Sequence, residues 1–281
     1  MNLPTFDRIP GAIAVDLDGT LLNSRTQLSE RNRMAIRGCV ACGIPVSIAT
    51  SRPIRTLRRL VGDNLTNICS LVIMTGAVGR AAPPLSGAFR EVLPTGVAKG
   101  IVDLLVGMGP EVRVTVEIEG WEFGANWAAD AETLWRLNAA TPDMVTSVDE
   151  ALTRNPAKIA ISRGGGDISD LAAEVSRRYG DIVSVVPANG MTFLNILSIR
   201  ASKSGALRHL LMSRDIAMAD VLAFGDDIPD VDLLTSCGTA VAMANAVPEV
   251  LSLCSYSTTS NDDDGVAVVL ERVLTISGLE Q

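Results

Sequence analysis

Asp16-Leu17-Asp18-Gly19-Thr20-Leu21-Leu22 is the stretch of this sequence that decides its fold class. It continues an apolar run, Ala12–Val15, that predicts a buried strand. Side chains alternate between the two faces of a strand, so Asp16 and Asp18 can point one way while Leu17 packs the other way. Two like charges that close repel each other unless a cation or a shared proton offsets the repulsion. The stretch therefore indicates a cation-dependent site or, taken alone, a strand that ends in an acidic turn.

The composition narrows the fold class and the partners. The chain has 281 residues, of which 47% are apolar and only 4% aromatic, which predicts an aliphatic core like that of parallel-sheet α/β proteins. The net charge is −8, and the densest group of basic residues has the spacing of a solvated helix face: Arg52, Arg55, Arg58 and Arg59. We therefore expect no nucleic acid partner. No apolar run approaches the roughly 18 residues of a membrane span, so we expect no membrane partner either.

The cysteines and the N-terminal residues predict a cytoplasmic protein. Pro4 and Pro10 interrupt the stretch in which a signal peptide would have an unbroken apolar segment. Five scattered cysteines are a poor framework for disulfide bonds. Cys39 and Cys42 form a CxxC pair, but no second pair completes a zinc site, so we expect small buried side chains within a helix. The single histidine, His209, argues against histidine-rich metal sites and against a Ser-His-Asp triad.

Strands and helices alternate in the first part of the chain, which predicts a doubly wound parallel sheet and thus an α/β fold. Between the first two strands, Ser29 can cap a helix that ends just before Gly43. The strands are predicted at 12–15, 44–49 and 71–74.

The pattern changes after Pro83-Pro84 and returns near Ala206. Residues 112–119 alternate apolar and polar side chains, which predicts a strand with one face in a core and the other in water. Further elements are predicted in this middle part: helices at 96–107, 130–139 and 168–179, and strands at 158–162, 182–186 and 192–197. Strands at 221–224 and 240–243 and a helix at 266–275 then restore the first pattern. We therefore expect a core formed by 1–83 and 198–281, interrupted by an inserted α/β domain at 84–197.

A second acidic cluster, Gly225-Asp226-Asp227-Ile228-Pro229-Asp230-Val231-Asp232, follows another apolar strand. In a parallel sheet the carboxyl ends of the strands lie along one edge, where ligand crevices form, so this cluster is expected beside Asp16 and Asp18. Such a group of carboxylates is strongly unfavourable without compensation, and Mg²⁺ suits a site with few carboxylates and a substrate phosphate. Taken alone, the second cluster also fits the acidic first turn of a helix.

Two further positions fit a phosphate site. Thr50 ends the second strand, where its hydroxyl and the amides of Ser51 and Arg52 can face an anion. Lys203 stands just before a helix and can offset phosphoryl charge. None of these residues alone indicates a binding site, but together with the acidic clusters they predict phosphate binding.

In this order, the motifs resemble those of the haloacid dehalogenase superfamily and, within it, the Cof-like sugar-phosphatase branch with an inserted α/β cap. The matching motifs are Asp16-x-Asp18-Gly-Thr-Leu, Thr50-Ser-Arg, Lys203-Ser-Gly and Gly225-Asp226-x-x-x-Asp230. Two C-terminal stretches, 238–249 and 260–267, also resemble signatures of this branch. The resemblance covers nearly all of the core, whereas in the cap it is only architectural.

The resemblance implies a magnesium-dependent phosphatase that acts on a small phosphorylated metabolite such as a sugar phosphate. Asp16 would attack phosphorus and form an aspartyl-phosphate, and Asp18 would act first as general acid and then as general base. Three residues would bind the phosphoryl oxygens: Thr50, Ser51 and Lys203. Four residues would hold Mg²⁺: Asp16, Asp18 through its backbone carbonyl, Asp226, and Asp230 either directly or through a ligand of the ion.

Three positions depart from the family pattern. Ser51 replaces the usual glycine after the motif threonine, Pro229 replaces the usual asparagine, and Thr75-Gly76 replaces Asn-Gly. None of these changes removes a nucleophile, an acid or a metal ligand. Together they are compatible with altered specificity or reduced turnover.

Several functions stay open on the sequence alone. A dedicated disaccharide-phosphate or mannosyl-phosphoglycerate phosphatase would share these motifs and the cap style. A catalytically weakened, phosphatase-like binding protein belongs to a different class, and Ser51 and Pro229 favour it. A dehalogenase does not need Asp18 or the second acidic cluster, whereas a phosphomutase is compatible with both. The sequence predicts neither the physiological substrate nor the oligomeric state.

Overall fold

The computed structural model describes residues 1–164, 166–188 and 191–278. Its contacts divide the chain into two units. Unit 1 comprises Met1–Ser51, Leu57–Phe89 and Ser202–Gln281, and unit 2 comprises Arg52–Thr56 and Arg90–Ala201. Within the described residues, no helix is long and apolar enough to cross a membrane.

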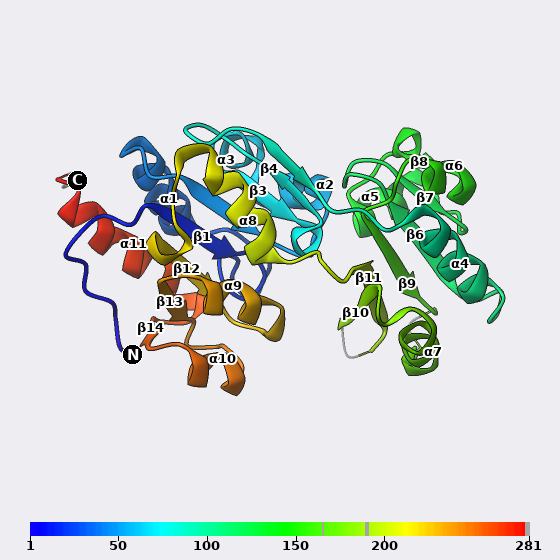
Figure 1. Ribbon diagram of the computed structural model, residues 1–281. Helices are drawn as coiled ribbons and strands as arrows, with labels where there is room; N and C mark the ends of the chain where they lie inside the picture. The colour runs from blue at the N-terminus through cyan, green and yellow to red at the C-terminus, as the bar shows by residue number, and fades with distance from the viewer. Residues whose placement is uncertain (165, 189–190, 279–281) are drawn as a thin grey trace. The chain divides into compact units, whose positions relative to one another are not determined.

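Unit 1 is built on one twisted sheet (Figure 1). In chain order its strands are β1 (Ala12–Asp16), β2 (Val46–Ala49), β3 (Ser70–Ile73), β4 (Val78–Arg80), β5 (Ala88–Arg90), β12 (Val221–Gly225), β13 (Thr239–Ala242) and β14 (Tyr256–Ser257). Across the sheet they follow the order β14-β13-β12-β1-β2-β3-β4-β5. The strands from β14 to β3 are parallel, and β4 is antiparallel to β3. The α/β class with a parallel sheet is thus confirmed.

Helices pack on this sheet because its central strands are apolar on both faces. Ser29 caps the first helix by accepting a hydrogen bond from the Asn32 amide at 3.0 Å, and Gly43 follows its end with a φ of 79°, as predicted. On one face, Ala12 and Ala14 of β1 share a buried cluster with Leu207. The helices are α1 (Glu30–Ala41), α2 (Ile54–Val61), α3 (Asp63–Thr66), α8 (Lys203–Leu211), α9 (Val231–Ser236), α10 (Pro248–Leu253) and α11 (Gly265–Ile276). The first residues of α2, up to Thr56, belong to unit 2.

Unit 2 has its own sheet and its own core. Its strands are β6 (Arg113–Glu117), β7 (Phe123–Ala125), β8 (Val145–Thr146), β9 (Lys158–Ser162), β10 (Val183–Ala188) and β11 (Phe193–Ser198), in the order β10-β11-β9-β6-β7-β8. Neighbouring strands are antiparallel except β7 and β8. One face packs its valines and isoleucines, such as Val114 and Ile159, against helices that include α4 (Thr95–Val106) and α7 (Ser169–Tyr179). The remaining helices are α5 (Ala131–Asn138) and α6 (Val148–Thr153).

The other face of β6 differs from the prediction. The alternation of residues 112–119 predicts that Thr115 and Glu117 face water, which is wrong, because they are only 9% and 3% exposed. Trp127 Nε1 donates to Thr115 Oγ1 at 3.1 Å, and the guanidinium of Arg55 donates to both Glu117 oxygens at 2.5 and 2.7 Å. Arg55, predicted on a solvated helix face, is itself only 4% exposed. A paired charge can be buried where an unpaired one cannot, so polarity alone misplaces both partners.

The cysteines are free thiols, and one of them departs from the expected position. Cys39 is buried within α1, as predicted. Cys42 is the half-buried residue that ends α1, so it is not a helical core residue.

Candidate active site

Three strand ends meet at the carboxyl edge of the unit 1 sheet. β1 ends at Asp16, and its neighbour β12 ends at Gly225, one residue before Asp226. On the other side of β1, Asp16 is paired with Ala49 of β2, so Thr50 leaves the sheet at the same level. Because apolar side chains fix the register of all three strands, these polar residues are brought to one edge by the core beneath them.

A buried lysine joins two of the carboxylates. Lys203 Nζ donates to Asp16 Oδ1 and to Asp230 Oδ1, each at 2.6 Å. All three side chains are nearly inaccessible, with exposed fractions of 2% for Lys203, 8% for Asp16 and 3% for Asp230. Charge-assisted hydrogen bonds of this length in a buried place hold the groups in a defined geometry.

The turn after β12 is folded around the Asp230 carboxylate. Asp230 Oδ2 accepts hydrogen bonds from the amides of Asp226 and Asp227, at 3.0 and 3.2 Å. A Cβ on Gly225 would lie 2.6 Å from the Cβ of Asp230, so only glycine fits there. Oxygens of three carboxylates then lie within 4.8 Å of one another: Asp16, Asp226 and Asp230.

The cluster carries more negative than positive charge, and the pKa values reflect this excess. Burial raises the pKa of Asp16 well above its ordinary value, and the charge of Asp230 raises it further, against the opposing effect of Lys203. Burial also raises the pKa of Asp226 to about 6, although a hydrogen bond from Thr20 works against the rise. Burial alone would lower the pKa of Lys203, but Asp16 and Asp230 outweigh it, so the ammonium stays charged. A cation at this place would relieve the repulsion.

Asp18 and Thr20 lie in the loop that follows β1. Asp18 is half-buried and pairs through its backbone with Leu22 in an isolated bridge. Thr20 Oγ1 donates to Asp226 Oδ1 at 2.7 Å. Gly19 has a φ of 80°, and a Cβ on it would lie 2.2 Å from Asp226 Oδ2, so the loop is pressed against this carboxylate. The Asp18 carboxylate is not one of the three clustered carboxylates.

Thr50 and Ser51 stand at the end of β2. Thr50 is fully buried, its amide donates to Val72 O at 2.8 Å, and its carbonyl accepts from the Thr75 amide at 3.0 Å. Ser51 is half-buried and is not among the residues with positive φ, so serine in place of glycine causes no backbone strain there. The structure thus puts both residues at the same sheet edge as Asp16, one and two residues after Ala49, which pairs with it.

The start of α8 is braced from two sides, and sequence reasoning missed both supports. Asp232 accepts hydrogen bonds from the amide and the hydroxyl of Ser204, at 2.8 and 2.7 Å. Gly76 has a φ of 84°, and a Cβ on it would lie 1.9 Å from the carbonyl oxygen of Ser202. The departure Thr75-Gly76 therefore keeps the one residue that this close approach requires. Asp232 belongs to the second acidic cluster of the sequence, but nothing in the sequence pairs it with Ser204.

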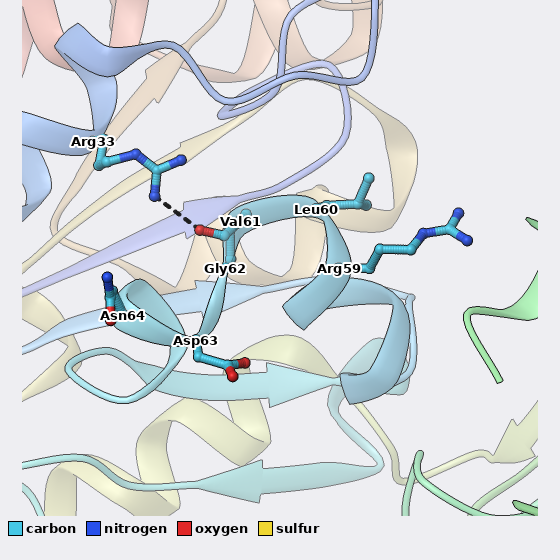
Figure 2. Close-up of a pocket in the computed structure, with 7 residues that line it drawn as sticks. All are labelled: Arg33, Arg59, Leu60, Val61, Gly62, Asp63 and Asn64. Atoms are coloured by element: carbon cyan, nitrogen blue, oxygen red, sulfur yellow. Dashed lines mark hydrogen bonds between the residues drawn. The ribbon is translucent and has the colours of Figure 1, made fainter. Parts of the chain in front are cut away.

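Figure 2 shows a pocket elsewhere in unit 1, around the turn between α2 and α3. Arg33 reaches across it and donates from Nη1 to Val61 O at 2.9 Å. Its other lining residues are Arg59, Leu60, Gly62, Asp63 and Asn64. None of these belongs to the carboxylate cluster, and the turn carries no group that points to catalysis.

Comparison with known proteins identifies the family of this chain. It matches the model of the haloacid dehalogenase-like hydrolases over residues 13–270. A candidate phosphatase of Haemophilus influenzae is 28% identical over 273 residues, which cover 93% of this chain and 97% of that protein. The 5-amino-6-(5-phospho-D-ribitylamino)uracil phosphatase YcsE of Bacillus subtilis is 25% identical over 260 residues, 92% of this chain and 94% of the other. The crystal structure of TM0651 from Thermotoga maritima has the same fold, with a TM-score of 0.79 at 23% identity, over 94% of this chain and 97% of that one.

Proposed function

The chain belongs to the haloacid dehalogenase-like hydrolase family and is a phosphatase, and we propose that it hydrolyses sugar phosphates or similar small metabolites through an aspartyl-phosphate on Asp16. The observation that carries the proposal is the position of Lys203 between Asp16 and Asp230, with Asp226 within reach of the same point. Phosphoryl transfer depends mostly on positioning and on stabilisation of charge. A buried ammonium beside a carboxylate nucleophile and two further carboxylates supports both requirements.

In the proposed mechanism, an oxygen of Asp16 attacks phosphorus while the bond to the leaving alcohol breaks. Asp18 gives its proton to that alcohol, so that the product leaves uncharged. In the second step a water molecule gives a proton to Asp18 and attacks the aspartyl-phosphate, which releases phosphate and restores the Asp16 carboxylate. Lys203 orients Asp16 for the first step, and Lys203, Thr50 and Ser51 bind the phosphoryl oxygens.

The residues present fit Mg²⁺. Three carboxylates and one ammonium leave two negative charges if all are ionised, which is the charge of one divalent cation. The donors are hard oxygens, the kind that Mg²⁺ prefers. We propose that four residues hold the ion: Asp16, Asp18 through its carbonyl, Asp226 and Asp230. When bound, the ion would offset the charge of the phosphoryl group.

We propose that the inserted domain, 84–197, selects the substrate. YcsE is by name a phosphatase of a ribityl phosphate, which supports a phosphorylated sugar or sugar alcohol as the substrate class. Disaccharide-phosphate and mannosyl-phosphoglycerate phosphatases perform the same chemistry and differ only in the group that carries the phosphate. The free thiols of the cysteines support a cytoplasmic location.

The test is phosphate release from a broad panel of phosphorylated metabolites, with and without Mg²⁺, by the wild-type protein and Asp16→Asn. The amide of asparagine has nearly the shape of the carboxylate and is not nucleophilic, so we expect release to vanish while the fold is kept. Asp103→Asn is the matched control, because Asp103 is an exposed carboxylate paired with Lys99 on α4.

Full activity in Asp16→Asn would rule out the covalent mechanism. If the wild-type protein folds and binds Mg²⁺ but releases no phosphate from any compound of the panel, the hypothesis of a phosphatase-like binding protein is favoured instead. Magnesium-dependent release that ranks the panel would also identify the substrate class.

A further inference from the structure

Two C-terminal segments with family-like sequence, 238–249 and 260–267, contain no residue of the proposed chemistry. The first follows β13, and the second leads into α11. Their contacts are nevertheless directed at the loops that carry the carboxylates. These contacts all lie within unit 1.

Asn245 is the centre of these contacts. Its Nδ2 donates to the carbonyl oxygen of Gly19 at 2.8 Å, and its Oδ1 accepts from the amide of Asn261 at 2.9 Å. A carbonyl can only accept and an amide N–H can only donate, so the two partners fix the orientation of the Asn245 side chain. Both ends of this amide are therefore in use.

The brace continues on both sides of Asn245. Asn261 Nδ2 donates to the carbonyl oxygen of Leu22 at 2.9 Å, three residues after Gly19. Two residues after Asn245, the amide of Val247 donates to the carbonyl oxygen of Asp226 at 2.9 Å. One short segment thus holds the loop after β1 and the turn after β12 at the same time.

We infer that Asn245 is a positioning residue: it fixes the Gly19–Thr20 peptide and thereby sets Asp18 and Thr20 against Asp226. This inference rests on the proposed mechanism, in which Asp18 transfers the proton and its carbonyl holds the metal. Asn245 touches the loop backbone and acts on the reaction only through it.

The loop has little freedom to absorb the loss of this bond. Gly19 lies so close to Asp226 that a Cβ would come within 2.2 Å of Oδ2, and Thr20 Oγ1 is held by the same carboxylate at 2.7 Å. A rotation of the Gly19–Thr20 peptide would therefore move the Asp18 carbonyl on one side and the Thr20 hydroxyl on the other. Displacements of about 1 Å in such a site can cost on the order of a hundredfold in rate.

The test compares Asn245→Asp and Asn245→Ala with the wild-type protein. Aspartate keeps the acceptor for the Asn261 amide and puts an oxygen against the Gly19 carbonyl, whereas alanine removes both bonds without adding charge. Asn2→Asp is the matched control, because Asn2 Nδ2 also donates to a backbone carbonyl, that of Ser255, at 2.8 Å. The readouts are kcat and KM well below the melting temperature, the melting temperature itself, and the Mg²⁺ dissociation constant by calorimetry.

We expect both Asn245 variants to lower kcat by about 10- to 100-fold, with KM changed less than about twofold and weaker Mg²⁺ binding, whereas Asn2→Asp behaves as wild type. Unchanged kcat and Mg²⁺ affinity in both Asn245 variants, with or without a lower melting temperature, would overturn the inference. Failure of the proposed function looks different, because the wild-type protein would then show no phosphate release that depends on Asp16.

Discussion

The two units bury charge in opposite ways. In unit 2, the guanidinium of Arg55 donates to both oxygens of Glu117, at 2.5 and 2.7 Å. It also donates to the carbonyl oxygens of Gly120 and Asn138, at 3.1 and 3.0 Å. The guanidinium also lies 4.5 Å from the centroid of the Phe123 ring. In unit 1, one ammonium faces three carboxylates. Glu117 thus has no surplus of negative charge around it and serves the fold, whereas the unit 1 cluster has such a surplus and is suited to a further cation.

The largest test of this difference replaces the buried cation in each unit, by Lys203→Met and Arg55→Met. Lys203→Met leaves the carboxylates of Asp16 and Asp230 without the cation that binds them, and Arg55→Met does so for Glu117. The loss of such a buried partner costs about 3–5 kcal/mol of unfolding free energy. Only the unit 1 cluster can recruit Mg²⁺ in place of the lost ammonium. We therefore expect Mg²⁺ to restore a large part of the stability of Lys203→Met and none of that of Arg55→Met.

Denaturant unfolding with a chelator and with Mg²⁺ measures these effects, and the tryptophans separate the units. Trp121, Trp127 and Trp135 all lie in unit 2, so fluorescence follows that unit while circular dichroism follows the whole chain. An equal response of the two variants to Mg²⁺ would remove the distinction between the units.

The second prediction concerns Lys158, which adds a buried positive charge to unit 2. Burial lowers its pKa to about 8, against the opposing charge of Glu117 and with a smaller contribution from Arg55. The unfolded chain holds this proton up to about pH 10.4, so between these two pH values the unfolded state binds more protons and stability rises with pH. The gain is on the order of 3 kcal/mol, and it should be absent from Lys158→Met.

Fluorescence-detected unfolding of unit 2 across that pH range is the measurement. Lys99→Met is the control, because Lys99 is an exposed lysine paired with Asp103 on the same unit. The same rise in stability in Lys158→Met and in the wild-type protein would contradict a buried lysine at this position.

The third prediction uses the pKa of Asp226, which burial raises to about 6. Without Mg²⁺, the folded state keeps this proton better than the unfolded chain, so stability falls as the pH rises from about 4 to this value. Mg²⁺ needs the ionised carboxylate, so its stabilisation is present above about pH 6 and is lost as the pH falls through that value. At a concentration of about 100 times the dissociation constant the stabilisation is about 2.7 kcal/mol.

Scanning calorimetry over a pH series, with a chelator and with Mg²⁺, measures this dependence. Asp226→Asn should abolish the magnesium effect at every pH. Stabilisation by Mg²⁺ that is equally large at pH values well below the pKa would show that Asp226 is not a ligand.

The sequence was sufficient for the sheet of unit 1 and for the edge where the polar residues gather. Asp16 and Asp226 each follow an unbroken apolar run, and short connections between such runs leave a parallel sheet as the simple solution. The apolar runs and their connections are therefore enough to predict that both carboxylates lie at one edge of the sheet, without knowledge of any contact. Their roles in catalysis and metal binding stay predictions.

What the sequence could not provide is pairing between distant residues. Glu117 and Arg55 are 62 positions apart, and each alone has the polarity of a surface residue. Asp232 and Ser204 are likewise joined only by the fold, 28 positions apart. The pattern of side chains along the sequence shows whether a position is polar. Whether a polar side chain is buried depends on its partner, which the pattern does not show.

The smallest predicted effect concerns Pro229. It tests whether the unit 1 cluster lacks one uncharged hydrogen-bond donor. Proline offers no N–H, and this residue lies between Asp227 and Asp230 in the turn around the cluster. Pro229→Asn adds amide donors there, which we expect to raise kcat or lower KM by about tenfold or less, the value of one hydrogen bond. Pro229→Ala is the matched control, because it removes the ring without adding a side-chain donor. If both variants keep the kcat and KM of the wild-type protein, proline at this position has no functional consequence, and the site needs no further donor from this residue.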